Sequence, residues 1–165
     1  RVFDLANLAS ERDPANLPRL LAALDDPSEP VRWWAAQGCT LLGQKASPAE
    51  TALRQRLADP SSAVQIAAAE ALGRQGQAEI ALPVLEHWLQ STNQPAAALQ
   101  AANVLDRFGE TARPVLPAMR RVLANATSAQ NQTGRTGEYP VRILERIISV
   151  LDGKVPPLVY PAPID

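Results

Sequence analysis

The stretch Val31-Arg32-Trp33-Trp34-Ala35-Ala36 decides the fold, because its pattern returns at a fixed interval. It aligns with Val64-Gln65-Ile66-Ala67-Ala68-Ala69 and then with Ala97-Ala98-Leu99-Gln100-Ala101-Ala102, each 33 residues further along the chain. Self-similarity at such a period is the signature of stacked structural repeats. A fourth copy, from Val141 to Gly153, fits the same template if an insertion near residues 126–138 is accepted.

Each repeat is predicted to contain two antiparallel helices, since apolar residues recur at helical spacing and turn residues separate the runs. The chain has 165 residues, of which 29 are Ala and 21 are Leu, both strong helix formers, and only 4% are aromatic. The sequence predicts first helices over 14–24, 48–57, 79–89 and 112–123, second helices over 30–42, 62–74, 95–108 and 140–151, and a leading helix over 2–9.

Residues at the predicted helix ends support these boundaries. Asp13 before Pro14 is a typical helix start, and Ser47-Pro48-Ala49-Glu50 has the pattern of a capping box. The second helices are predicted to end at glycines, which adopt a left-handed conformation at low cost. These glycines are Gly43, Gly76, Gly109 and Gly153.

The predicted fold class is all-α, an α-α superhelix of about four helix pairs plus the leading helix. A helix pair cannot bury its apolar face alone, so successive pairs are expected to stack into a solenoid. The predicted repeat domain spans 1–153, with repeats near 13–43, 47–76, 78–109 and 111–153 and a loop insertion near 126–138. Residues 154–165 are rich in Pro and are predicted to form an extended tail.

The turn and second-helix sequences resemble HEAT-like repeats of the phycobilisome-lyase type. The shared pattern is Leu-x-x-x-Leu-x-Asp-Pro, followed by Val-Arg or Val-Gln and an Ala-rich helix. The resemblance implies a ladder formed by an Asp in the turn of each repeat and an Arg six residues later. Asp26 and Arg32 keep both members, whereas Asp59 is followed by Gln65. The ladder is therefore expected to be incomplete.

A narrower resemblance connects residues 9–18, 31–38 and 112–117 with the helical region that follows the catalytic domain in many bacterial sulfatases. Such enzymes use a Cys in a Cys-x-Pro-x-Arg motif, converted to formylglycine, beside acidic residues that hold calcium. Cys39 lacks the Pro and Arg of that motif, so no catalytic residue is assigned. The resemblance implies a C-terminal accessory region of a sulfatase, and a periplasmic or extracellular location for that parent enzyme.

Charge and composition narrow the classes of function. The 16 Lys and Arg residues nearly balance the 17 Asp and Glu residues, with no block of like charge, which argues against nucleic-acid and anionic membrane partners. His87 is the only histidine and Cys39 the only cysteine. No cluster with metal-ligand spacing is present, so we expect no metal, no cofactor and no catalytic activity of the chain by itself.

The most promising surface residues lie along the second helices. Trp33 and Trp34 diverge by about 100° on a helix. They are interpreted either as core residues or, for one of them, as a docking anchor. A polar row follows on the side predicted to be exposed. We call the following set the candidate docking row: Trp33, Gln37, Glu70, Arg74, Asn103, Arg107 and Arg146.

These observations favour a non-catalytic scaffold whose partner is its own upstream catalytic domain or another protein. Because the chain begins at Arg1 and residues 2–9 resemble half of a repeat, we expect it to be a fragment of a longer protein. One alternative is a free-standing adaptor. Another is a bilin-lyase-like enzyme, which a cavity lined by acidic and aromatic groups would favour.

Overall fold

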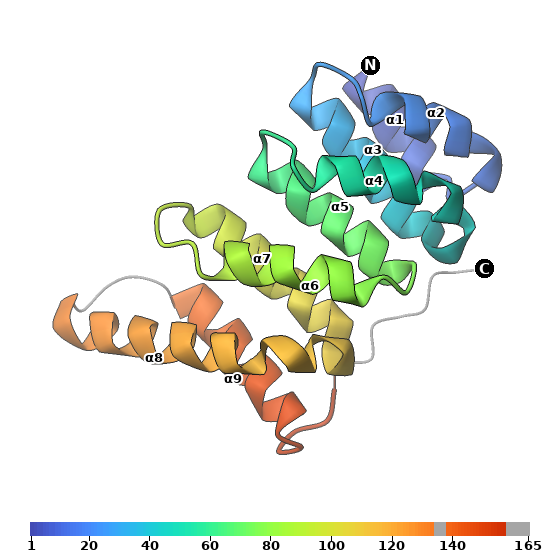
Figure 1. Ribbon diagram of the computed structural model, residues 1–165. Helices are drawn as coiled ribbons and strands as arrows, with labels where there is room; N and C mark the ends of the chain where they lie inside the picture. Colours follow the sequence, from blue (N-terminus) through green and yellow to red (C-terminus); the bar gives the residue numbers. More distant parts are fainter. Residues whose placement is uncertain (134–137, 158–165) are drawn as a thin grey trace. The chain divides into compact units, whose positions relative to one another are not determined.

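The computed structural model describes residues 1–133 and 138–157, with side chains described for 1–126 and 141–157 (Figure 1). Within these residues all regular structure is helical, as predicted. The α-helices are α1 (Val2–Ser10), α2 (Leu17–Ala23), α3 (Glu29–Leu42), α4 (Glu50–Arg56), α5 (Ser62–Arg74), α6 (Ala78–Leu89), α7 (Pro95–Phe108), α8 (Leu116–Thr133) and α9 (Glu138–Leu151). The 3₁₀ helices are η1 (Pro14–Asn16), η2 (Gly43–Ala49) and η3 (Gly109–Val115).

The second helix of each repeat, α3, α5, α7 or α9, agrees with the sequence prediction to within two residues at either end. The residues at the helix ends explain this agreement. Glycine follows α3 and α7 directly, and both Gly43 and Gly109 have a φ of 55°. An L residue with a side chain rarely adopts this conformation, so glycine ends the helix at a defined position. At the start of η1, the Asp13 side chain accepts a hydrogen bond from the Ala15 amide at 2.9 Å, as expected for a helix cap.

The predicted capping box at Ser47 is wrong. Ser47 lies inside η2, and Ala49, which immediately precedes α4, makes no side-chain cap. The backbone of Ala49 is already helical, with φ −83° and ψ −3°, whereas a capping residue usually has extended backbone. The 3₁₀ helices η1 and η2 lead directly into α2 and α4, which are therefore shorter than predicted, whereas α6 and α8 are longer than predicted.

The predicted loop at 126–138 is also wrong over most of its length. Helix α8 continues to Thr133, and α9 begins at Glu138, while residues 134–137 lie outside the described residues. The segment lacks an apolar period, which is why a loop was expected. It also contains no Gly or Pro before residue 134, so nothing in it interrupts a helix. Of the predicted tail, residues 154–157 are not helical and 158–165 lie outside the described residues.

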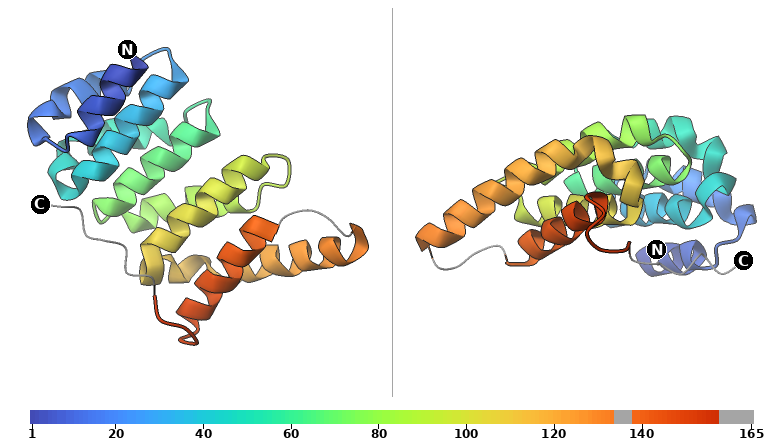
Figure 2. Two further views of the ribbon diagram at one scale, coloured as in Figure 1. Left: turned by 180° about the vertical axis from the view of Figure 1, so that it is seen from behind. Right: turned by 90° about the horizontal axis from the view of Figure 1, so that it is seen from below.

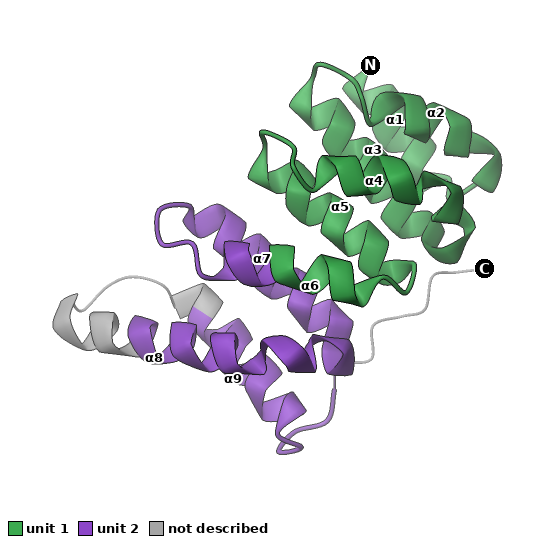
Figure 3. Ribbon diagram, in the orientation of Figure 1, with its two compact units in different colours: residues 1–84 green, residues 85–165 purple. Residues whose placement is uncertain are grey.

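The chain divides into two compact units, Arg1–Val84 and Leu85–Asp165, and the boundary falls within α6 (Figure 3). In the first unit, α1, α3 and α5 lie side by side in one layer, and α2 and α4 pack on them in a second layer (Figures 1 and 2). The core between the layers combines Ala with larger aliphatic residues. Its fully buried members include Leu20, Leu24, Ala35, Ala36, Leu53, Ala68 and Leu72.

Close helix packing in the first unit depends on Gly38 of α3. A Cβ atom at Gly38 would lie 2.6 Å from Leu20 Cδ2 and 3.2 Å from Ala9 Cβ. Leu20 belongs to α2 and Ala9 to α1, so three helices meet at this position. A residue without a side chain is therefore what lets these helices approach each other closely.

In the second unit, α9 packs against α7, α8 and η3. Leu105, Met119, Leu144 and Ile147 are among the side chains that fill its core. Among the described residues, none of the helices has both the length and the apolar composition that a membrane crossing needs.

Candidate functional site

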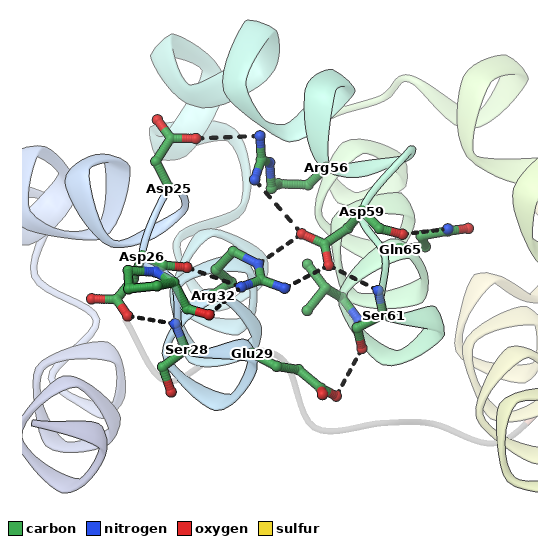
Figure 4. Close-up of polar contacts among 11 residues, drawn as sticks. Asp25, Asp26, Ser28, Glu29, Arg32, Arg56, Asp59, Ser61 and Gln65 are labelled. Carbon is green, nitrogen blue, oxygen red and sulfur yellow. Dashed lines mark hydrogen bonds and ion pairs between the residues drawn. The ribbon is translucent and has the colours of Figure 1, made fainter.

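A buried polar cluster occupies the turns that precede α3 and α5 (Figure 4). Arg32 Nε and Nη2 donate to Asp59 Oδ2 and Oδ1 at 2.7 and 2.8 Å. Arg32 Nη1 donates to the carbonyl oxygens of Asp26 and Pro27 at 2.9 and 3.1 Å. Arg32 and Asp59 are only 8% and 3% exposed. One guanidinium therefore joins the two turns through a two-pronged ion pair.

The environment of Asp59 favours its charged form. Burial disfavours the charge, but the hydrogen bonds from Arg32 and from the Ser61 amide, at 3.0 Å, together with the charges of Arg32 and Arg56, outweigh it and lower the pKa of Asp59. The hydrogen bond to Asp59 is likewise the main reason why the pKa of Arg32 is raised. Arg56 lies 3.6 Å from Asp59 and 3.3 Å from Asp25, so it extends the cluster toward the surface.

The two turns use equivalent contacts. Asp26 Oδ1 accepts from the Ser28 amide at 2.8 Å, as Asp59 does from its own turn. Gln65 Nε2 donates to the Asp59 carbonyl at 2.7 Å, which repeats the contact of Arg32 with the Asp26 carbonyl. The carboxylate partner of Arg32 is Asp59 of the following repeat, so one rung of the expected ladder is present and it connects two repeats. Sequence spacing places both acids in equivalent turns but does not say which one the arginine reaches.

Cys39 and His87, the two residues whose side chains were considered for catalysis, differ in burial. The Cys39 side chain is fully buried among core residues, and burial raises the pKa of its thiol to about 12. His87 is exposed, and its ring lies edge-to-face with Trp88 at a centroid distance of 4.9 Å. Within the described part of the chain, no group of three or more His, Cys, Asp or Glu side chains is placed to hold a metal ion.

The first-unit members of the candidate docking row differ in exposure. Trp33 and Gln37 of α3 are half-buried, and Arg74 at the end of α5 is exposed. Glu70 is only 4% exposed, so its predicted place on an exposed row is wrong. Ile66, one turn earlier on α5, is also buried, which shows that this flank of the helix is covered.

Trp33 and Trp34 are partly buried in the structure, and a role of either one as a docking anchor stays a prediction. Their rings meet edge-to-face, with a centroid distance of 4.9 Å and an interplanar angle of 79°. Both side chains are half-buried and pack against the core of the first unit. Each indole is thus held by the core on one side and retains accessible surface on the other.

In the second unit, Asn103 and Arg107 of α7 and Arg146 of α9 are half-buried. Arg146 forms an ion pair with Asp106. Arg107 and Arg146 also line a cleft of about 70 Å³. Sequence analysis missed this cleft, because its walls come from the end of α7 and from α9, and repeat spacing does not predict the space between them.

Comparison with protein families matches a model of HEAT repeats to residues 17–106 and, in an overlapping register, to residues 50–132. Comparison with curated proteins and with solved structures gives no significant match.

Proposed function

Since this chain belongs to the HEAT repeat family, we propose that it is a non-catalytic helical-repeat scaffold that docks another protein. Stacked helical repeats typically offer extended surfaces to protein partners. The observation that carries the proposal is the half-buried Trp33–Trp34 pair on α3. Tryptophan is over-represented among the residues that dominate binding energy at interfaces, because it covers a large area with few rotatable bonds.

The buried ladder supports this role by fixing the helix that carries the tryptophans. Arg32 directly precedes Trp33 and is held by hydrogen bonds to Asp59, Asp26 and Pro27. An anchor that is already ordered loses less conformational entropy when it binds. Gln37 follows one turn after Trp33 and adds a half-buried amide to the same helix.

We also propose that the chain has no catalytic activity of its own. The support is that the thiol of Cys39 is buried with a raised pKa, so it is a poor nucleophile. A cavity lined by both acidic and aromatic groups would support a bilin-lyase-like activity. The cleft of the second unit is lined by Asp106, Arg107, Arg146 and aliphatic side chains, and none of its lining residues is aromatic.

The scaffold proposal is tested by placing a photo-crosslinking amino acid at Gln37 and, as a matched control, at Arg54 on α4. Arg54 is exposed and pairs only locally, with Glu50 at 2.7 Å. Each protein is irradiated in extract of the source organism, and crosslinked partners are identified by mass spectrometry. We expect a specific partner from position 37 only, and equal capture from both positions would contradict the proposal.

The partner is then purified and its affinity measured by calorimetry. We expect Trp33→Ala to weaken binding about 30-fold, as for an interface residue that contributes about 2 kcal/mol. Gln37→Arg serves as a second variant, because it changes the accessible side of α3 without removing a core contact. Arg54→Ala should leave the affinity unchanged.

A finer proposal is that the chain docks in cis, as the accessory region of a bacterial sulfatase. Its support is the resemblance of residues 9–18, 31–38 and 112–117 to that region. Many of these residues also have packing roles, since Val31, Ala35, Ala112 and Val115 are buried. The coding sequence upstream of Arg1 tests the idea, and a preceding domain without a Cys-x-Pro-x-Arg motif would contradict it.

A further inference from the structure

We propose that Glu29 and Trp33 of α3 together bind an arginine side chain of the protein partner. This inference rests on the proposed docking function and specifies the chemistry that the partner presents to the helix with the two tryptophans. In this arrangement the guanidinium group stacks on the indole of Trp33 and pairs with the carboxylate of Glu29.

Glu29 and Trp33 are neighbours on the surface of α3. Residues four apart on a helix have Cβ atoms about 5–6 Å from each other. Glu29 is exposed and Trp33 is half-buried, so solvent reaches both side chains. The rings of Trp33 and Trp34 meet edge-to-face, an arrangement that leaves each indole at least one face free of the other. An acidic group and an aromatic surface are therefore accessible next to each other.

Glu29 is the acid of the inter-repeat cluster that no cation neutralises. The other acids of the cluster each have an arginine, in the pairs Asp25–Arg56, Asp26–Arg1 and Asp59–Arg32. Oε1 of Glu29 instead accepts a hydrogen bond from the Ser61 hydroxyl at 2.7 Å (Figure 4). Within the part of the chain that the structure describes, no Lys or Arg forms an ion pair with Glu29. Its negative charge is thus available to a partner.

The surrounding helices leave this charge uncompensated. Arg32 is the only other charged residue of α3, and it is buried and donates to Asp59 and to backbone carbonyls. The only charged residue within α1 is an acid, Asp4, which is exposed. The basic residue of α5, Arg74, lies in the last turn of that helix, whereas Glu29 lies in the first turn of α3 beside the start of α5. This end of the layer therefore favours a cation.

The combination of groups favours arginine among cations. A guanidinium group is planar, so it can lie flat on an indole and still direct N–H donors at a carboxylate in its own plane. Lysine carries a compact, strongly hydrated charge and does not stack in this way. An uncharged side chain would satisfy the indole but not Glu29.

The test is a titration of the full ¹⁵N-labelled chain with two capped peptides, acetyl-Ala-Arg-Ala-amide and its citrulline counterpart, at low and high salt. We expect the Arg peptide to shift the indole N–H signals of Trp33 and Trp34 and the amide signal of Glu29. Trp88 of α6 is the internal reference, because it is buried and its signal should not move. The citrulline peptide should bind about five-fold more weakly, since citrulline keeps the shape of arginine without its charge. High salt should weaken only the Arg peptide. Equal binding of both peptides, or shifts confined to other residues, would overturn the proposal.

Variants assign the contact to the two side chains. Glu29→Gln keeps an acceptor for the Ser61 hydroxyl but should abolish the preference for Arg over citrulline. Glu79→Gln is the matched control and should retain the preference, because Glu79 is likewise an exposed acid in the first turn of a helix, α6. Both substitutions remove the same favourable interaction with a helix dipole, so stability does not distinguish them.

Trp33→Leu keeps an apolar side chain toward the core but removes the aromatic face, and should weaken the Arg peptide about three-fold. Circular dichroism reports whether each variant folds. A preference for Arg that survives in folded Glu29→Gln would exclude the site, whatever the result for Trp33→Leu.

The two proposals can fail independently. If a partner crosslinks at Gln37 but the chain does not prefer the Arg peptide, the scaffold stands and the arginine site does not. If the chain prefers the Arg peptide through Glu29 but crosslinking at Gln37 equals the control, the arginine site stands and docking on α3 does not.

Discussion

Arg32 on α3 and Asp59 before α5 are 27 residues apart in the sequence and form a buried ion pair with two hydrogen bonds, of 2.7 and 2.8 Å. The pair connects one repeat with the next, because Arg32 also holds the backbone of its own turn at Asp26. Removing the guanidinium would leave the Asp59 carboxylate buried without its main partner. The stability of the first unit is therefore expected to depend on this contact.

Arg32→Ala is predicted to lower the free energy of unfolding by about 3–5 kcal/mol, the usual result of breaking a buried pair on one side. Urea unfolding followed by circular dichroism measures the change. Arg54→Ala is the control, because the Arg54–Glu50 pair is exposed and local, and its loss should cost at most about 0.5 kcal/mol. Equal effects of the two substitutions would contradict the assigned role of Arg32.

A double variant shows whether the loss comes from an orphaned charge. Arg32→Met with Asp59→Leu removes both charges and keeps comparable side-chain volume. We expect it to be more stable than either single variant, since the desolvation cost of the remaining charge disappears. Additive losses would contradict this, because they would mean that Arg32 and Asp59 stabilise the fold independently, through their other contacts.

The lowered pKa of Asp59 predicts an acid-dependent contribution to stability. A carboxylate whose pKa is lower in the folded state stabilises the fold above its unfolded pKa, near 3.9, and loses that contribution as the pH falls through the folded value. The stability difference between the parent and Asp59→Asn should therefore shrink as the pH falls below about 5. Asp152 also has a lowered pKa, because of its hydrogen bond with Lys154. Its contribution to stability is the same in the parent and in Asp59→Asn, so it does not affect the difference between them. A difference that stays constant down to acid unfolding would contradict this prediction.

The helical architecture could be predicted because local sequence sets it. The 33-residue register placed α5 and α7, and glycine ended α3 at Gly43. The errors arose where local pattern is not decisive. Ser47 has the residue type of a cap but lies in a 3₁₀ helix, and residues 127–133 lack an apolar period yet continue α8.

The candidate site was less predictable, because it depends on which side of each helix is covered. Helical periodicity predicted that Gln37 of α3 and Glu70 of α5 both lie on the exposed side of their helices. Gln37 is half-buried, whereas Glu70 is buried, because the side of α5 that carries Glu70 is covered. The partner of Arg32 likewise depends on the stacking of one turn on the next. Docking by the candidate row remains a prediction.

Cys39 is predicted to be unreactive while the chain is folded. Its side chain is fully buried and its pKa is about 12, so the thiolate is almost absent near neutral pH. A thiol-specific reagent such as a disulfide dye should label it only as the protein unfolds, with a rate that rises with denaturant in parallel with loss of helix. Rapid labelling of the native chain would show that this part of the core opens readily.

The last prediction concerns Gly38, where α1, α2 and α3 meet. Gly38→Leu is expected to lower the free energy of unfolding by about 1–3 kcal/mol through overpacking, because even a Cβ atom would lie 2.6 Å from Leu20 Cδ2. Ala22→Leu on the exposed side of α2 is the matched control and should change stability by less than about 0.5 kcal/mol.

Leu20→Ala supplies the second half of a double-mutant cycle at this position. Alone it should cost about 2–5 kcal/mol, because it empties a buried site. Leu20→Ala also removes the side-chain atoms that crowd Gly38, and the new leucine at position 38 would refill part of the lost volume. Gly38→Leu should therefore lower the free energy of unfolding by less in the Leu20→Ala protein than in the parent. Urea unfolding of the four proteins measures this coupling. If Gly38→Leu is as stable as the parent, or if its cost is the same in both backgrounds, then the close approach of α2 to α3 does not limit the side chain at Gly38.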